Sequence, residues 1–147
     1  MADLVKVEID GRGVATLTLA RAEKHNALSA ALIDAIREAV ERLGAEEAVR
    51  VVVVAAEGRS FCAGGDLAWM REQMEADGAQ RAVEAERLAG MLGAVNACPK
   101  PVIGRVHGNA FGGGVGLACV CDVAVAVEGA KFGFTETRLG LIPATIG

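Results

Sequence analysis

The sequence lacks the features of several classes of protein. No uninterrupted apolar stretch reaches the roughly 20 residues that a membrane helix needs, and the first residues show no charged and then apolar run of a secretory signal. Basic residues are scattered, and 15 lysines and arginines against 19 acidic residues give a formal net charge of −4. We therefore expect a cytoplasmic protein that binds neither a membrane nor a nucleic acid.

The cysteines lack the spacing of a metal site. Cys62, Cys98, Cys119 and Cys121 contain no CxxC pair and have no companion histidines at ligand spacing. They lie among apolar residues or glycines, so we expect buried, reduced thiols and no bound metal. The pair Cys119-x-Cys121 is only a weak metal signal.

Apolar residues are abundant, at 52% of the chain. This content, with no repeat or linker, predicts one domain over residues 1–147. Residues 139–147 carry apolar side chains with no further helix to cover them. We therefore expect either an incomplete domain or a partner that covers this segment.

The hydrophobic pattern predicts an α/β fold. Residues 4–9 and 14–19 alternate as the strands of a hairpin, and Ser29 can cap a helix that Gly44 is placed to end. The β-branched run 51–54 is typical of a parallel strand covered on both faces, and the segment after residue 134 is predicted as a loop. Further strands are predicted at 102–106, 122–127 and 131–134, and further helices at 66–75, at 79–97 and after the glycines at 112–116.

Two glycine-rich segments, 60–67 and 108–117, each follow a predicted strand and precede a helix. Glycine lets a ligand approach the backbone, and helix N-termini offer unpaired N–H donors. If Gly65 and Gly113 direct their N–H groups at one point, they form an oxyanion hole. Taken alone, each segment is better explained as a tight turn, and neither has the spacing of a phosphate loop or a dinucleotide fold.

Taken together, the motifs resemble the crotonase, or enoyl-CoA hydratase/isomerase, superfamily, and within it the methylglutaconyl-CoA hydratase-type members. The resemblance covers essentially the whole chain. The motifs that carry it are Lys24–Leu28, Phe61–Leu67, Pro101–Ile103, Gly108–Gly114, Cys121–Asp122, Phe132–Glu136 and Leu139–Pro143.

The resemblance implies a spiral of ββα units, with the family's C-terminal helical part absent, that binds a bent acyl-CoA. Gly65 and Gly113 match the two oxyanion donors, and Asp66 is equally well explained as an acid in the first turn of a helix. Coenzyme A is carried by the substrate, so no separate cofactor is implied, and the full-length protein is expected to be a homotrimer or hexamer. The implied substrate-binding residues are Lys24, Ala27, Ala63, Gly64, Asp66, Leu67 and Gly112.

Glu136 matches one of the family's two catalytic glutamates and is the predicted general base. Gly116 stands at the position of the other and cannot transfer a proton. The implied reaction is addition of water to an enoyl-CoA, with two alternatives left open: a single-base isomerase that moves a double bond, and a non-catalytic or truncated acyl-CoA-binding module. Arg71 or Arg138 could pair with a second carboxylate on a methylglutaconyl-type substrate, although a surface role is the simpler interpretation of each.

Overall fold

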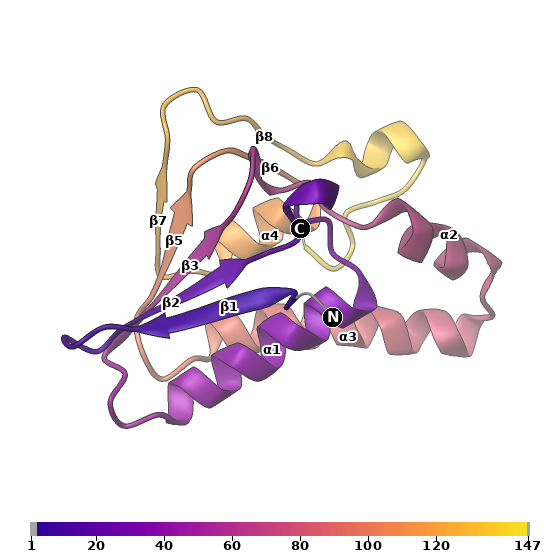
Figure 1. Ribbon diagram of the computed structural model, residues 1–147. Helices are drawn as coiled ribbons and strands as arrows, with labels where there is room; N and C mark the ends of the chain where they lie inside the picture. The colour runs from indigo at the N-terminus through magenta and orange to yellow at the C-terminus, as the bar shows by residue number, and fades with distance from the viewer. Residues whose placement is uncertain (1–2, 147) are drawn as a thin grey trace.

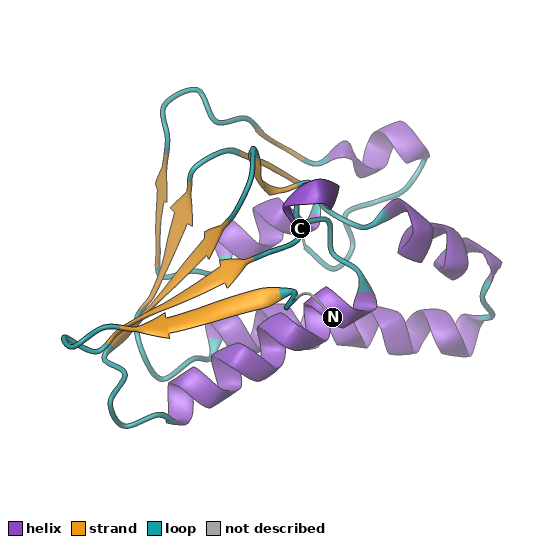
Figure 2. Cartoon of the chain, viewed as in Figure 1, coloured by secondary structure: helices purple, strands orange, loops and turns teal. Residues whose placement is uncertain are grey.

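A five-stranded sheet forms one side of the protein in the computed structural model, which describes residues 3–146 (Figures 1 and 2). Its order is β1-β2-β3-β5-β7. The first two strands form the predicted antiparallel hairpin, and every other neighbouring pair is parallel. The strands are β1 (Val5–Ile9), β2 (Val14–Leu19), β3 (Val51–Ala56), β5 (Val102–Val106) and β7 (Val123–Ala126).

A second, three-stranded parallel sheet joins β4 (Ser60–Cys62), β6 (Asn109–Phe111) and β8 (Phe132–Gly133). Along the chain, a strand of the large sheet is followed by a strand of the small sheet and then by a helix, three times over. This repetition confirms the predicted spiral of ββα units. Strands β4 and β6 were not predicted because three residues in a glycine-rich segment are too short to show a period.

Helices α1 and α3 pack side by side along the large sheet (Figure 1). Ser29 caps α1 as predicted, accepting from Leu32 N at 3.3 Å. The prediction that Gly44 ends this helix is wrong: the helix runs to Ala45, and Gly44 is buried where a Cβ would lie 3.0 Å from Pro99. The α-helices are α1 (Ala30–Ala45), α2 (Leu67–Glu75), α3 (Gly78–Asn96) and α4 (Gly113–Cys119), and the 3-10 helices are η1 (Ala22–Lys24) and η2 (Thr135–Leu139), the latter within the predicted loop.

The hydrophobic core lies between the large sheet and its helices. Val52 and Val54 of β3 are fully buried there, in one hydrophobic cluster with the apolar residues of α1. The expectation that β3 is covered on both faces is wrong, because Val51 and Val53 on the other face remain partly exposed. β-branched residues suit a half-exposed strand as well as a buried one. Within residues 3–146, no helix combines the length and the apolar character needed to cross a bilayer.

Candidate active site

The two glycine-rich segments lie against each other at the small sheet. Gly64 has a φ of +92°, and a Cβ on it would lie only 2.9 Å from Phe111 O. Leu28, which precedes α1, joins the first segment: its N–H donates to Gly64 O at 2.7 Å, and its carbonyl accepts from Asp66 N at 2.9 Å. This parallel bridge uses the groups on either side of Gly65 and leaves the Gly65 N–H out of the pairing.

A cavity of about 150 Å³, here named the central cavity, lies between the segments. Gly65, Gly113 and Glu136, the three predicted catalytic residues, all line it. The structure therefore brings together residues that are separated by up to 71 positions in the sequence. The other lining residues are Leu28, Trp69, Met70, Leu88 and the stretch 142–146.

The N–H groups of Gly65 and Gly113 have no acceptor among the described residues 3–146. Gly113 is the first residue of α4, so its N–H is one of the four that a helix leaves unpaired. Two unpaired donors at the wall of a small, largely apolar cavity can stabilise a negatively charged oxygen.

Glu136 enters the central cavity from η2. Its Oε2 is buried and, among residues 3–146, has no hydrogen-bond partner, which is costly for a carboxylate. Gly112, with a φ of +49°, lies directly beside it, and a Cβ on Gly112 would be 2.5 Å from Glu136 Oε1. The missing side chain at residue 112 thus provides the space for the carboxylate.

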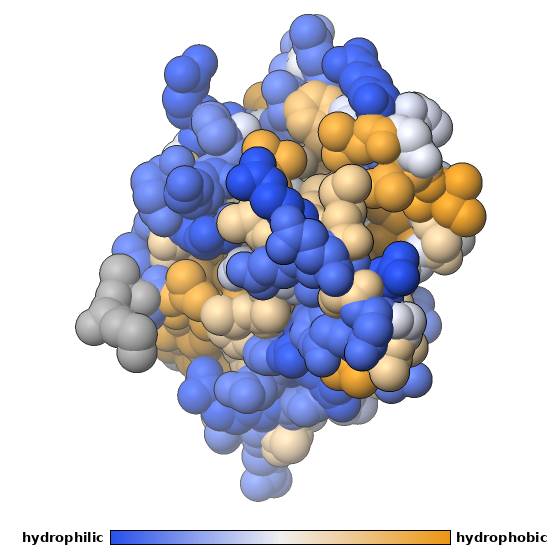
Figure 3. Space-filling view, turned by 90° about the vertical axis from the view of Figure 1, so that its right-hand side faces the viewer, coloured by the Kyte–Doolittle hydropathy of each residue, from blue (hydrophilic) through white to orange (hydrophobic). Residues whose placement is uncertain are grey.

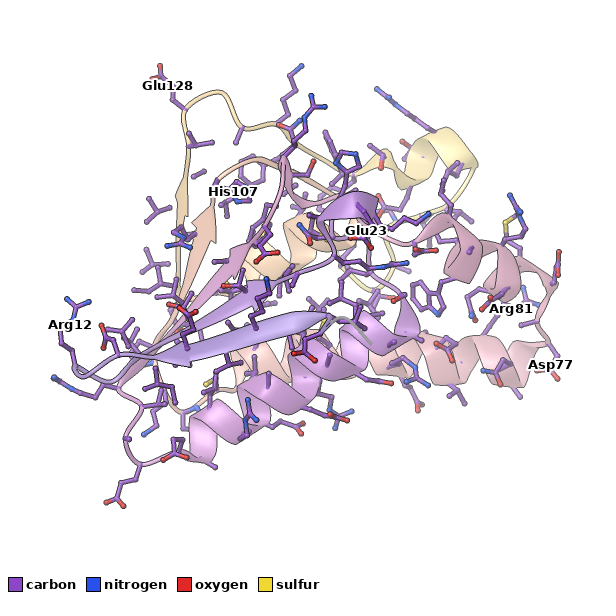
Figure 4. All side chains as sticks on the ribbon, viewed as in Figure 1. Arg12, Glu23, Asp77, Arg81, His107 and Glu128 are labelled. Atoms are coloured by element: carbon purple, nitrogen blue, oxygen red, sulfur yellow. The ribbon has the colours of Figure 1, made fainter. Side chains whose placement is uncertain are left out.

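A second and larger hollow of about 580 Å³, the outer cleft, lies on the other side of Gly65, which lines both spaces. Glu23 of η1, labelled in Figure 4, is one of the residues that line this cleft. The predicted substrate-binding residues Lys24, Ala27, Ala63, Asp66 and Leu67 line it. Gly64 and Gly112 line neither space and instead form the close turns between the two segments.

Asp66 has a structural role in addition to its place in the outer cleft. Its carboxylate caps α2 by accepting from Ala68 N at 2.8 Å and Trp69 N at 3.3 Å, and it pairs with Arg21 Nη1 at 2.7 Å. Burial raises the pKa of Asp66, but Arg21 and the two backbone N–H groups outweigh it, so that the pKa lies below its ordinary value. Asp66 is therefore the N-cap of α2, one residue before the first turn in which it was expected, and its role in substrate binding stays a prediction.

An apolar groove of about 450 Å³ runs between α2 and η2. Met70 lines both this groove and the central cavity, and Leu67, Met74 and Leu139 on it are largely exposed. Figure 3 looks onto this side of the protein and shows hydrophobic atoms gathered in its upper part.

Comparison with known proteins assigns this architecture to a family. The enoyl-CoA hydratase/isomerase family model matches residues 10–147. The chain belongs to the enoyl-CoA hydratase/isomerase family. This match confirms the family resemblance that the motifs indicated.

Individual relatives carry the names of enzymes. An enoyl-CoA hydratase of Alternaria alternata is 40% identical over 134 residues, which are 91% of this chain and 43% of the relative. The mitochondrial methylglutaconyl-CoA hydratase of the mouse is 33% identical over 138 residues, 93% of this chain and 43% of the relative. The chain spans about half the length of the curated relatives it matches.

Solved structures of the family have the same fold. An enoyl-CoA hydratase from Shewanella pealeana superposes with a TM-score of 0.94 at 39% identity, over 98% of this chain and 54% of that one. One from Mycobacterium smegmatis gives 0.92 at 41% identity, over 97% and 55%. Because these two structures are about 40% identical to this chain and superpose closely on it, the ββα spiral is the fold of the family.

Gly116, which the resemblance matches to the family's second catalytic glutamate, does not line the central cavity. A Cβ there would be 2.9 Å from Ile146 Cγ2 and 3.6 Å from Leu92 Cδ1. Among the described residues that line the central cavity, Glu136 is thus the one acid.

The cysteines are free thiols that differ in exposure. All four cysteines are free, but full burial holds only for Cys62: Cys98 and Cys121 are partly exposed, and Cys119 is exposed at the end of α4. Burial raises the pKa of Cys62 to about 11, so its thiol is not a nucleophile at neutral pH. Residues 3–146 contain no cluster of histidine, cysteine and acidic residues that could hold a metal ion.

Trp69 and Met70 of α2 also line the central cavity. Leu28, Leu88 and residues 142–146 were not assigned to the site. Leu28 was visible as a motif residue, whereas Leu88 is one apolar position of a long helix and gave no separate signal.

Proposed function

We propose that the protein binds an acyl-CoA thioester and adds water to the double bond of an enoyl-CoA. One observation carries this proposal: the unpaired N–H groups of Gly65 and Gly113 and the carboxylate of Glu136 share the central cavity. The family membership supports the reaction class, and the shared cavity supports the role that we propose for each residue.

In the proposed reaction the thioester carbonyl oxygen accepts hydrogen bonds from Gly65 and Gly113. Glu136 takes a proton from water as the water oxygen bonds to C3, and the electrons of the C2–C3 double bond move toward the carbonyl. The resulting enolate oxygen is stabilised by the two N–H donors. Glu136 then returns the proton to C2, so a single carboxylate completes the addition.

We place coenzyme A in the outer cleft. Lys24 and Arg71 both line this cleft, and cationic side chains suit the phosphate groups of the nucleotide. Since Gly65 lines both spaces, the thioester would lie where they meet. No cofactor beyond the substrate's own coenzyme A is proposed, and a homotrimeric or hexameric, cytoplasmic full-length protein stays a prediction.

Isomerisation of a 3-enoyl-CoA is the second candidate. Glu136 is the one acid among the described lining residues of the central cavity, and moving a double bond needs only one base. A methylglutaconyl-type substrate would carry a second carboxylate on its acyl group, and pairing of this carboxylate with Arg71 or Arg138 stays a prediction. A module that binds acyl-CoA without turnover is the third.

The test uses 2-enoyl-CoA and 3-enoyl-CoA substrates with the wild type, Glu136→Gln and Glu128→Gln. Glu128 is exposed on the turn after β7 and serves as the matched control (Figure 4). Loss of the ultraviolet absorbance of 2-enoyl-CoA with formation of the 3-hydroxy product supports hydration; conversion of 3-enoyl-CoA alone supports the isomerase.

We expect Glu136→Gln to lower kcat by about 10²–10⁴-fold, the usual contribution of a positioned acid or base, and Glu128→Gln to leave it unchanged. A Glu136→Gln protein with full activity would remove the assigned base. Binding without turnover of either substrate would favour the non-catalytic module.

A further inference from the structure

Helix α2 forms one wall of the central cavity, although none of its residues 67–75 is buried. Asp66 caps its first turn, and the indole N–H of Trp69 donates to Glu84 Oε2 on α3 at 2.9 Å. Figure 4 shows Asp77 and Arg81 at the turn between the two helices, on the far side of the molecule from the β1–β2 hairpin. The bond from Trp69 to Glu84 therefore ties an exposed helix to a packed one.

Glu84 is a buried carboxylate for which the proposed reaction has no use. Its side chain is 9% exposed and lines neither the central cavity nor the outer cleft. It also accepts from Gln80 Nε2 at 3.2 Å and from Arg87 Nε at 3.1 Å. Arg87 in turn pairs with Asp34 of α1, so the chain of contacts connects α1, α3 and the indole of α2.

This network of contacts reaches the central cavity through Trp69. Trp69 lines it, together with Leu88, which lies one turn after Glu84 on α3. At about 150 Å³, the cavity is comparable to an engineered cavity that holds benzene. It therefore has room for an acyl group of roughly six carbon atoms, provided that the indole keeps its place.

We propose that Glu84 is a positioning residue that holds the Trp69 indole as a wall of the central cavity and so fits the cavity to short acyl groups. Without Glu84, the indole N–H loses its acceptor and is driven to turn toward water. The inference rests on the proposed function, because it names the acyl groups that this cavity takes.

The experiment compares free coenzyme A with butyryl-CoA by calorimetry, since only the thioester reaches the central cavity. Glu84→Ala should weaken butyryl-CoA binding about tenfold, as expected for one lost buried hydrogen bond, and leave the affinity for coenzyme A unchanged. Glu84→Gln keeps an oxygen acceptor and should restore the ratio of the two affinities. Glu86→Ala removes an exposed acid of the same helix and should match the wild type.

Fluorescence gives a readout that needs no ligand, because Trp69 is the only tryptophan of the chain. In Glu84→Ala we expect emission at longer wavelength and stronger quenching by acrylamide, both reversed in Glu84→Gln. Trp69→Ala enlarges the cavity and should raise the affinity for octanoyl-CoA relative to butyryl-CoA.

A wild-type ratio of butyryl-CoA to coenzyme A affinity in Glu84→Ala would overturn the inference. If Glu84→Ala does not fold, Trp69→Phe removes the indole N–H and keeps an aromatic wall; the same tenfold loss supports the inference, and an unchanged ratio overturns it. Wild-type protein that binds neither butyryl-CoA nor coenzyme A would instead overturn the proposed function, and the assignment of an acyl wall with it.

Discussion

Gly112→Ala should lower turnover about 100-fold by displacing the carboxylate of Glu136. A Cβ at residue 112 would lie 2.5 Å from Glu136 Oε1, where ordinary contact begins at 3.4 Å. The carboxylate must therefore move by about 0.9 Å, and a misplacement of roughly 1 Å in a catalytic group can reduce the rate about 10²-fold.

The backbone adds a cost in stability that has to be separated from this effect. Gly112 has φ +49° and ψ −120°, a conformation that costs an L residue about 1–3 kcal/mol. Gly129→Ala is the matched control, since Gly129 has φ +81° and nothing within 4 Å of its added Cβ.

The assay is kcat for hydration of a 2-enoyl-CoA, measured beside the Tm of each protein. Both alanine variants should have a lower Tm, but only Gly112→Ala should lose turnover. A folded Gly112→Ala protein with the wild-type kcat would refute the reasoning, because Glu136 would then not need its present position.

Three further outcomes follow from the same structure. Asp66→Ala should lower the free energy of unfolding by about 2 kcal/mol, since it removes a helix cap and leaves Arg21 unpaired in a largely buried site. Folding lowers the pKa of Asp66, so the loss in the free energy of unfolding should be complete above about pH 4 and should shrink as the pH falls through the folded-state pKa. Urea denaturation measures this loss, and a loss independent of pH would contradict the ion pair. Gly116→Glu should lower the Tm without raising kcat, because its Cβ would meet the C-terminal segment at 2.9 Å; faster hydration would show that this position can still serve the site. Iodoacetamide at neutral pH should label the exposed Cys119 before Cys62, whose pKa burial raises to about 11, and peptide mass spectrometry that finds the reverse order would contradict the burial of Cys62.

The large sheet could be predicted from the sequence because its strands have their own period or composition. Apolar and polar residues alternate in β1 and β2, and the run of valines in β3 is typical of a strand. In the small sheet, β8 lies within the strand predicted at 131–134, but β4 and β6 could not be predicted this way. These two strands have three residues each and are fixed by pairing with their neighbours rather than by local preference.

The same division applies to the site. Gly65, Gly113 and Glu136 were predictable because they lie in motifs whose combination is specific, and the structure places all three at one cavity. The role of Gly112 was not, since only the fold brings it against Glu136. The bond between Trp69 and Glu84 was hidden as well, because the two residues lie on different helices, 15 positions apart.

The central claim is that Gly65 and Gly113 hold a thioester oxygen between their N–H groups. The most direct measurement is the infrared difference spectrum of the protein with an acyl-CoA labelled with ¹³C at the thioester carbonyl. Two hydrogen bonds to the oxygen weaken the C=O bond, so the account predicts a carbonyl band at lower frequency in the complex than in water. A bound thioester whose carbonyl band lies at or above its frequency in water would contradict it.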